Sequence, residues 1–127
     1  MIQEVKEKFI EEFSSKPRIF RSPGRINIIG EHTDYNEGFV LPAAIDKEIV
    51  FAVAPNNCGK FCFYANDLKE YGEFPYVVEV SQLWANYLLG VVAQIQKCGV
   101  HVPTVDVVFG GNVPLGAGVS SSAALEC

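Results

Sequence analysis

The stretch PLGAGVSSSAAL at residues 114–125 decides how the rest of the sequence is interpreted. Gly116 and Gly118 carry no Cβ atom, so the backbone there adopts positive φ angles readily and turns successive N–H groups toward one hollow that suits a phosphate. Three consecutive serines follow; one hydroxyl caps a helix and the others offer oxygen atoms to a phosphate or a Mg²⁺ ion. These serines are Ser120, Ser121 and Ser122. The pattern predicts a nucleotide-phosphate site.

The residues on either side of this stretch favour the same interpretation. Residues 105–109 are mostly apolar and β-branched, which predicts a strand, and residues 123–126 favour a helix whose first N–H groups point back toward the anion. The simpler alternative is an ordinary strand-to-helix turn with a serine cap, which glycine-rich turns alone favour. The three serines shift the balance toward a phosphate site. No lysine follows the glycines, so the stretch is not a P-loop.

The composition describes a folded, acidic protein. Of 127 residues, 49% are hydrophobic and 20% are charged, which is enough for a buried core. The net charge is -5 and the basic residues form no stripe, so nucleic acid is not an expected partner. The apolar runs are much shorter than the roughly 18 residues that a membrane span needs, and the N-terminus does not look like a signal peptide. We therefore expect a cytoplasmic location.

The four cysteines form no Cys-x-x-Cys pair and have no histidine at zinc-finger spacing. Cys58 and Cys62 are close enough in sequence to suggest a clip. Cys62, however, stands between two phenylalanines and has the alternation of a strand residue. We therefore expect reduced thiols that bind no metal. The other two cysteines are Cys98 and Cys127.

Hydrophobic periodicity predicts the remaining elements. We expect an amphipathic helix over residues 1–13 and a second helix over 84–97 that ends before Gly99. Pro23 and Gly24 predict a turn, Asp46 and Lys47 predict a hairpin, and Pro42 predicts an irregular or edge strand. The strands are expected at residues 16–22, 24–29, 38–45, 48–54, 60–64, 73–80 and 104–110.

A second informative stretch covers residues 24–35. It begins as an alternating strand and breaks at Gly30, after which polar groups follow one another at a density that a core does not allow. Carboxylates and an imidazole suit a ligand with several hydroxyl groups, and Arg25 supplies a fixed positive charge. Taken singly, His32 is more often a structural histidine, and Arg25 or Asp34 more often a surface ion pair or a turn residue. The polar run is Glu31, His32, Thr33, Asp34 and Tyr35.

Two large aromatic residues begin the second predicted helix. Trp84 and Tyr87 lie on adjacent turns of one face. They either pack in the core, which is the commoner outcome, or wall an adenine base, whose flat face suits aromatic contact. The sequence leaves both possibilities open.

The glycine–serine stretch, residues 24–35 and the run that follows Gly38 closely resemble the galactokinases, within the GHMP family of small-molecule kinases. The resemblance spans most of the chain. It implies an α+β fold, a mixed or antiparallel β-sheet with helices packed on one face, with residues 1–127 forming an amino-terminal lobe that is incomplete at its C-terminus. It also implies transfer of the γ-phosphoryl group of ATP to the anomeric hydroxyl of galactose, with Mg²⁺.

The resemblance assigns roles by position. Glu31, His32 and Asp34 match the sugar-binding residues, and Arg25 matches the arginine near the transferred phosphoryl group. Thr33 matters because similar kinases acting on N-acetylgalactosamine usually carry an apolar residue there. The phosphate cradle corresponds to Gly116, Gly118, Ser120, Ser121 and Ser122, with Ser121 or Ser122 near the metal; Trp84 and Tyr87 match the helix beside the nucleotide.

Two other functions compete with this one. A galactokinase-like sensor binds galactose and ATP without catalysis, but similar sensors lack residues in the serine turn, which is complete here. A structural module binds neither ligand, and its serines are only helix caps. Calorimetry with Mg-ATP and with galactose separates these possibilities.

Galactokinases are much longer than this chain, and their proposed general base lies beyond the position that matches Cys127. The helix that the serines open has room for only about two turns here, too few for a stable isolated helix. We therefore predict that the purified polypeptide of 127 residues phosphorylates little or no galactose. Robust turnover by this polypeptide in a galactose-dependent ADP assay would contradict the prediction.

Overall fold

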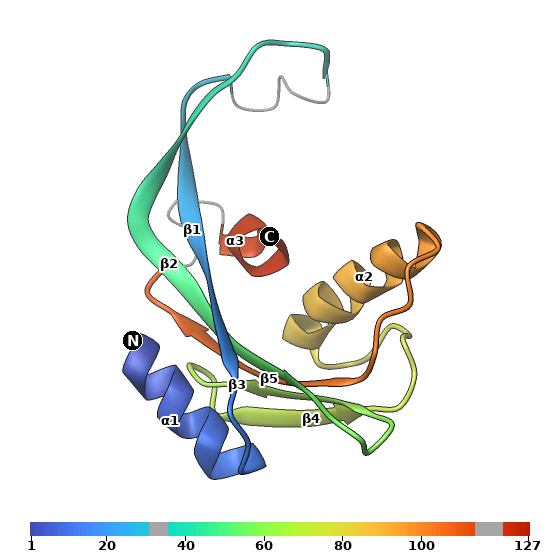
Figure 1. Ribbon diagram of the computed structural model, residues 1–127. Coiled ribbons are helices and arrows are strands. Elements are labelled where there is room, and N and C mark those ends of the chain that lie inside the picture. The colour runs from blue at the N-terminus through green and yellow to red at the C-terminus, as the bar shows by residue number, and fades with distance from the viewer. Residues whose placement is uncertain (31–35, 114–120) are drawn as a thin grey trace.

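A computed structural model of the chain describes residues 1–30, 36–113 and 121–127. Within these residues, five strands form one sheet in the order β1-β2-β5-β3-β4 (Figure 1). The strands are β1 (Arg18–Ile29), β2 (Leu41–Pro55), β3 (Phe61–Ala65), β4 (Glu70–Phe74) and β5 (Val105–Gly111); the helices are α1 (Ile2–Phe13), α2 (Leu83–Lys97) and α3 (Ser121–Glu126). β3 pairs in parallel with β5 and the other pairs are antiparallel, which confirms the predicted mixed sheet.

α1 covers one face of the sheet, as its apolar stripe predicts. Val5 and Phe9 are fully buried against side chains of β2, β3 and β5. The helix ends where Ser14 adopts the left-handed conformation with φ 52°. This helix confirms the prediction for residues 1–13.

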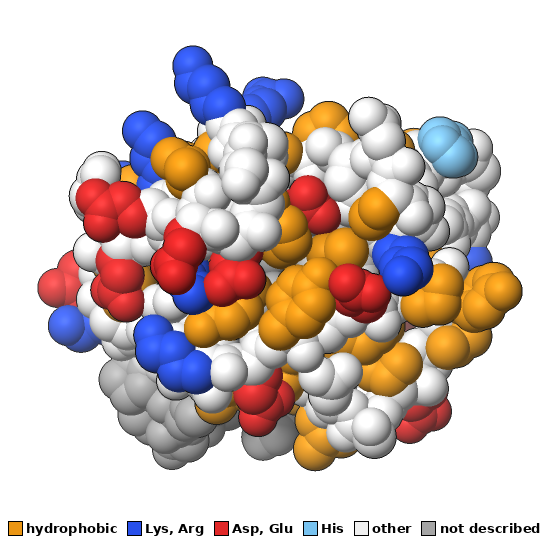
Figure 2. Space-filling model, turned by 90° about the horizontal axis from the view of Figure 1, so that it is seen from below, with side chains coloured by type: hydrophobic (Ala, Val, Ile, Leu, Met, Phe, Trp, Pro, Cys, Tyr) orange, Lys and Arg blue, Asp and Glu red, His pale blue; other side chains and the backbone are white. Residues whose placement is uncertain are grey.

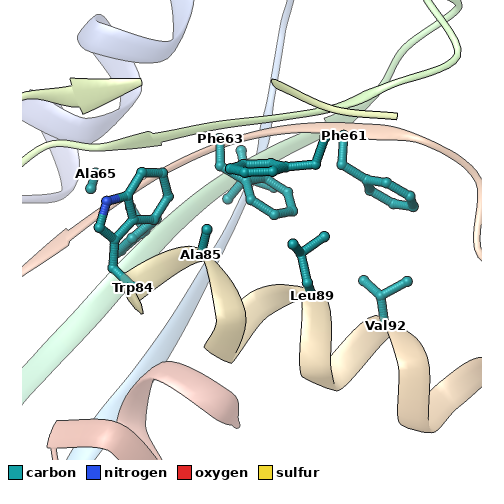
Figure 3. Close-up of a cluster of buried hydrophobic side chains, with 10 residues drawn as sticks. Phe61, Phe63, Ala65, Trp84, Ala85, Leu89 and Val92 are labelled. Atoms are coloured by element: carbon teal, nitrogen blue, oxygen red, sulfur yellow. The ribbon is translucent and has the colours of Figure 1, made fainter. Parts of the chain in front are cut away.

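α2 covers the opposite face. Its buried side chains, among them Trp84 and Leu89, point at the phenylalanines of β3 (Figure 3). All five residues of β3 are buried. Phe61, Phe63 and Ala65 lie in the cluster beneath α2, and Tyr64 lies in the cluster beneath α1. The expectation that helices pack on one face was therefore wrong: the sheet is covered on both faces.

None of the described helices is long and apolar enough to cross a membrane.

Two predicted turns are absent: β1 continues through Pro23 and Gly24, and β2 continues through Asp46 and Lys47. Gly24 and residues 45–47 have no register partners, so both predicted turns fall on one irregularity in the β1–β2 ladder. The two strands pair on both sides of this irregularity, and neither strand ends there. The expectation for Pro42 is confirmed: it lies beyond the part of β2 that pairs with β5, next to a second register shift.

β4 lies earlier in the sequence than predicted. Lys69 has a positive φ of 57°, which closes the turn after β3, and the strand starts at Glu70 instead of residue 73. Residues 75–80 lie outside regular structure. The predicted strand over 73–80 was therefore wrong for most of its length.

The surface seen from below carries both charge signs. Figure 2 shows acidic and basic side chains on the same face, with hydrophobic side chains between them. This face therefore lacks the uniform positive charge that nucleic-acid binding requires.

The surroundings of Gly90 and Gly111 predict that substitution by alanine changes the stability of the protein in opposite directions. A Cβ atom on Gly90, in α2, meets no atom within 4 Å, whereas one on Gly111 would lie 2.5 Å from the main-chain oxygen of Glu48. We expect Gly90→Ala to raise the free energy of unfolding by about 0.5–1 kcal/mol. We expect Gly111→Ala to lower it by about 1–3 kcal/mol, because backbone must move. Denaturant unfolding of both variants measures the difference, and equal midpoints would contradict the packing around β5.

Candidate functional site

A cleft of about 510 Å³ lies between the sheet, α2 and α3. Most of its wall is apolar, and polar side chains contribute at Asp67 and Ser122. The lining residues are Ile49, Ala65, Asp67, Leu68, Leu83, Trp84, Tyr87, Phe109, Gly111, Val113, Ser122 and Leu125. An apolar cleft of this size with a few polar groups is typical of a small-molecule site.

The two ends of the glycine–serine stretch meet at this cleft. Val113 precedes residues 114–120, Ser122 follows them, and both line the cleft. α3 begins at Ser121, which confirms the helix predicted after the serines, and packs against α2 and β1. The stretch between these ends therefore starts and finishes at the cleft.

The end of β5 is held in place by hydrogen bonds just before that stretch. The main-chain N–H of Gly111 donates to Asp67 Oδ2 at 2.8 Å. Asn112 and Glu48 bond reciprocally: the N–H of Glu48 donates to Asn112 Oδ1 at 2.8 Å, and the N–H of Asn112 donates to the oxygen of Glu48 at 3.1 Å. These bonds fix where the chain leaves the sheet.

Close backbone packing accompanies these bonds. A Cβ atom on Gly110 would lie 3.2 Å from Asn66 and from Asp67, and Gly111 has no room beside β2. Asn66 is itself fixed, since its N–H donates to the oxygen of Phe109 and its Nδ2 donates to Glu4 on α1. Gly110 is therefore needed for the turn after β3 to reach the end of β5, and Gly111 is needed where β5 passes close to β2.

Trp84 belongs to the core and also forms part of the cleft wall. Only 9% of it is exposed, its ring contacts Phe74 and Phe109 at centroid distances of 6.3 and 5.8 Å, and its Nε1 donates to Glu70 Oε2 at 2.6 Å. Tyr87 is 40% exposed and lines the same cleft. Of the two aromatic residues, Tyr87 therefore offers the more accessible surface to a flat ligand.

Arg25 lies on β1, opposite Ala44 on β2, immediately after the register shift. Its side chain is exposed and makes an interaction within the protein. Arg25 is not one of the described residues that line the cleft. β1 nevertheless packs against α3, so the strand that carries Arg25 and the helix that begins at Ser121 are neighbours.

Several predicted site residues lie outside the described ranges. The sugar-site residues Glu31, His32 and Asp34 follow Gly30, whose positive φ of 101° confirms the predicted break in the strand. The phosphate-site residues Gly116, Gly118 and Ser120 also lie outside these ranges, and of Ser121 only the backbone is described. The roles predicted for all of these residues stay predictions.

Sequence reasoning missed the residues that support the cleft. Asp67, Glu70 and Asn112 lie outside every predicted helix and strand, and no function was predicted for them. The run Gly110-Gly111-Asn112 at a strand end was a usable signal, because adjacent glycines there indicate close backbone approach. Nothing in the sequence linked Asp67 to Gly111, since the bond spans 44 positions.

Comparison with known proteins adds to this geometry. Residues 7–55 match a family model described as the galactokinase galactose-binding signature. A galactokinase from Thermosipho africanus is 46% identical over 106 residues, which is 84% of this chain and 29% of that protein. The chain belongs to the galactokinase family. It spans about a third of the length of the galactokinases that it matches.

Solved structures agree with the family assignment. The crystal structure of Lactococcus lactis galactokinase complexed with galactose matches with a TM-score of 0.85 and 32% identity, covering 98% of this chain and 34% of that one. Methanococcus jannaschii mevalonate kinase matches with a TM-score of 0.68 and 17% identity, over 88% of this chain and 38% of that one. The second match shows a shared fold only.

Proposed function

We propose that this chain is part of a galactokinase that transfers the γ-phosphoryl group of ATP to the anomeric hydroxyl of galactose, giving galactose 1-phosphate and ADP. The observation that carries the proposal is the match of residues 7–55 to the galactose-binding signature. The similarity to a galactokinase solved with galactose supports the same substrate. The proposal includes a cytoplasmic location, since such a kinase draws on the ATP of the cell.

In this proposal the sugar is held by the polar stretch after Gly30. The carboxylates of Glu31 and Asp34 accept hydrogen bonds from sugar hydroxyls, and His32 donates or accepts one. Arg25 offsets the negative charge that develops on the transferred phosphoryl group. Residues 1–127 thus form the sugar- and nucleotide-binding part of one lobe.

The nucleotide is assigned to the cleft. A purine ring fits the apolar wall beside Tyr87, and the phosphates extend toward the glycine–serine stretch that begins and ends there. N–H groups near Gly116 and Gly118 and the hydroxyl of Ser120 would contact the phosphate oxygens. Phosphoryl transfer depends mainly on positioning and charge neutralisation, which such a cradle supplies.

Mg²⁺ is the cofactor expected with ATP, and the residues present fit it. Hydroxyl oxygens are ligands that Mg²⁺ accepts, and Ser122, at the start of α3, is exposed and lines the cleft. Ser121 and Ser122 are the residues that would hold the ion. When bound, it neutralises charge on the ATP phosphates.

The function is tested directly with the complete enzyme that contains this chain. Incubation with Mg-ATP and galactose should give ADP and a sugar phosphorylated at the anomeric position, identified by phosphorus NMR. Omitting galactose, or replacing it by mevalonate, should leave ATP unchanged. Binding of both ligands without ADP formation would indicate a sensor instead.

Tyr87→Ala should weaken ATP binding about tenfold or more, because stacking of a base on an aromatic ring contributes about 1–3 kcal/mol. Tyr87→Phe should bind nearly as well as the original protein, since the ring is kept. Tyr76→Ala is the matched control, because Tyr76 is exposed and does not line the cleft. Calorimetry measures the three affinities. Unchanged binding by Tyr87→Ala would place the base elsewhere.

Arg25→Ala should lower kcat by about 100-fold or more with a smaller change in KM for galactose, since a charge that acts on the transition state is removed. Arg18→Ala is the control, because Arg18 lies exposed at the other end of β1. Steady-state rates over a range of galactose concentrations separate kcat from KM. A kcat equal to that of the control would remove Arg25 from the mechanism.

A further inference from the structure

The turn between β2 and β3 brings together two thiols and a carboxylate from distant parts of the sequence. Cys58 lies in the turn, Cys62 in β3 and Asp106 in β5, and one potential ligand atom from each lies within 4.8 Å of the other two. Cys62 and Asp106 are register partners in the parallel β3–β5 pair, so their side chains leave the sheet on the same face. Both cysteines are free.

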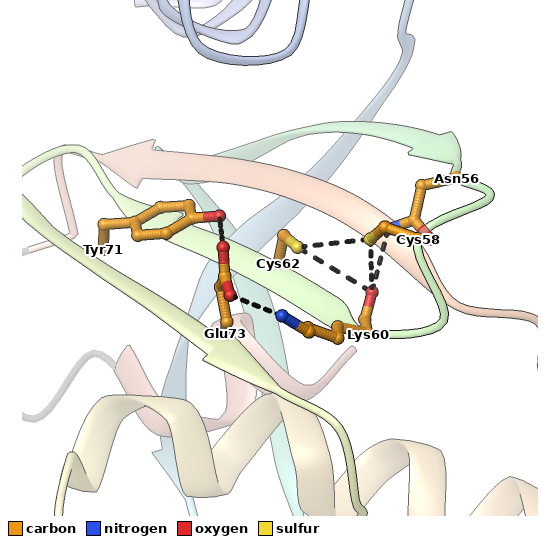
Figure 4. A network of polar contacts seen from close by, with 6 residues as sticks. All are labelled: Asn56, Cys58, Lys60, Cys62, Tyr71 and Glu73. Atoms are coloured by element: carbon orange, nitrogen blue, oxygen red, sulfur yellow. Dashed lines mark hydrogen bonds and ion pairs between the residues drawn. The ribbon is translucent and has the colours of Figure 1, made fainter.

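The spacing of the sulfur atoms matches that of ligands around a zinc ion. Cys58 Sγ and Cys62 Sγ are 3.8 Å apart. Two sulfur atoms at about 2.3 Å from a tetrahedral ion lie about 3.8 Å from each other. Both thiols also approach one acceptor, the main-chain oxygen of Lys60, at 3.6 and 3.8 Å (Figure 4). The two sulfur atoms therefore already converge on one point.

Asn56 supports the carboxylate of this cluster. Its Nδ2 donates to Asp106 Oδ1 at 2.7 Å and to the main-chain oxygen of Lys60 at 2.9 Å. The Oδ1 atom of the same amide is buried and has no hydrogen-bond partner in the part of the chain that the structure describes. A water molecule bound to an ion beside Asp106 would supply the missing donor.

A neighbouring carboxylate is already engaged. Glu73 is the register partner of Cys62 on β4, but it accepts hydrogen bonds from Lys60 Nζ at 3.1 Å and from the Tyr71 hydroxyl at 3.0 Å (Figure 4). Asp106 is therefore the carboxylate that lies with the two thiols, while Glu73 is held by Lys60 and Tyr71.

We propose that Cys58, Cys62 and Asp106 bind one thiophilic divalent cation of the zinc type, with a water molecule in the fourth position. Two sulfur ligands favour such an ion over Mg²⁺ or Ca²⁺, which prefer oxygen ligands. The ion would tie the turn after β2 to the first residues of β5. This site does not depend on the proposed kinase function, and it revises the expectation that these cysteines bind no metal.

Cobalt(II) titration of the reduced complete protein, without oxygen, tests the site. One equivalent should give the thiolate-to-cobalt charge-transfer band and the intense d–d bands of a tetrahedral complex, and excess zinc should remove both. Cys58→Ser should abolish these bands and is expected to fold, because Cys58 is exposed. Cys98→Ser is the matched control: Cys98 is exposed outside the cluster, and the variant should bind like the original protein.

Two further measurements keep the test decisive. Asn56→Ala should weaken cobalt binding about tenfold or more without changing the stoichiometry, as expected when a group that orients a ligand is lost. Zinc should raise the unfolding temperature of the original protein but not of Cys58→Ser. Octahedral cobalt spectra, or binding that survives Cys58→Ser, would overturn the proposal. A Cys58–Cys62 disulfide formed under mild peroxide, with no metal uptake by the reduced protein, would assign the pair to redox chemistry instead.

Discussion

The central place of β5 in the sheet is the constraint on which the rest of the structure depends. β5 pairs with β2 on one side and with β3 on the other, and residues 107–109 are buried. Burial on both faces requires a helix on each side of the sheet. α1 and α2 meet this need, and α2 also carries the chain from the β3–β4 hairpin to the start of β5.

The cleft follows from the same constraint. Because α2 packs on the phenylalanines of β3 and β5, its first turn sets Trp84 against Phe109 and leaves Tyr87 at the surface of the cleft. Because β5 is held by Asp67 and β2 where it ends, the chain enters the glycine–serine stretch from a fixed point. The core that stabilises the fold therefore also positions the proposed nucleotide site.

Patterns within one element were predictable from the sequence, and pairing between elements was not. The stripe of α1, the aromatic start of α2 and the break at Gly30 depend on local periodicity and backbone freedom, and the structure confirms them. The turns predicted at Pro23-Gly24 and Asp46-Lys47 were wrong, because both pairs of residues fall on one irregularity in the β1–β2 ladder and the strands pair on both sides of it. The residues of the sugar site and of the phosphate site were predicted from sequence motifs and not from periodicity, and their roles stay predictions.

The two ends of β5 serve different purposes. The strand has seven residues, and at about 3.3 Å for each residue its ends are roughly 20 Å apart. Asp106, near the start, faces the cysteines, whereas Gly111, at the end, faces the cleft. An ion at the start is therefore too distant to act on a phosphoryl group in the cleft. It would act by holding the turn after β2 and the strand together, which stabilises the element that positions the glycine–serine stretch.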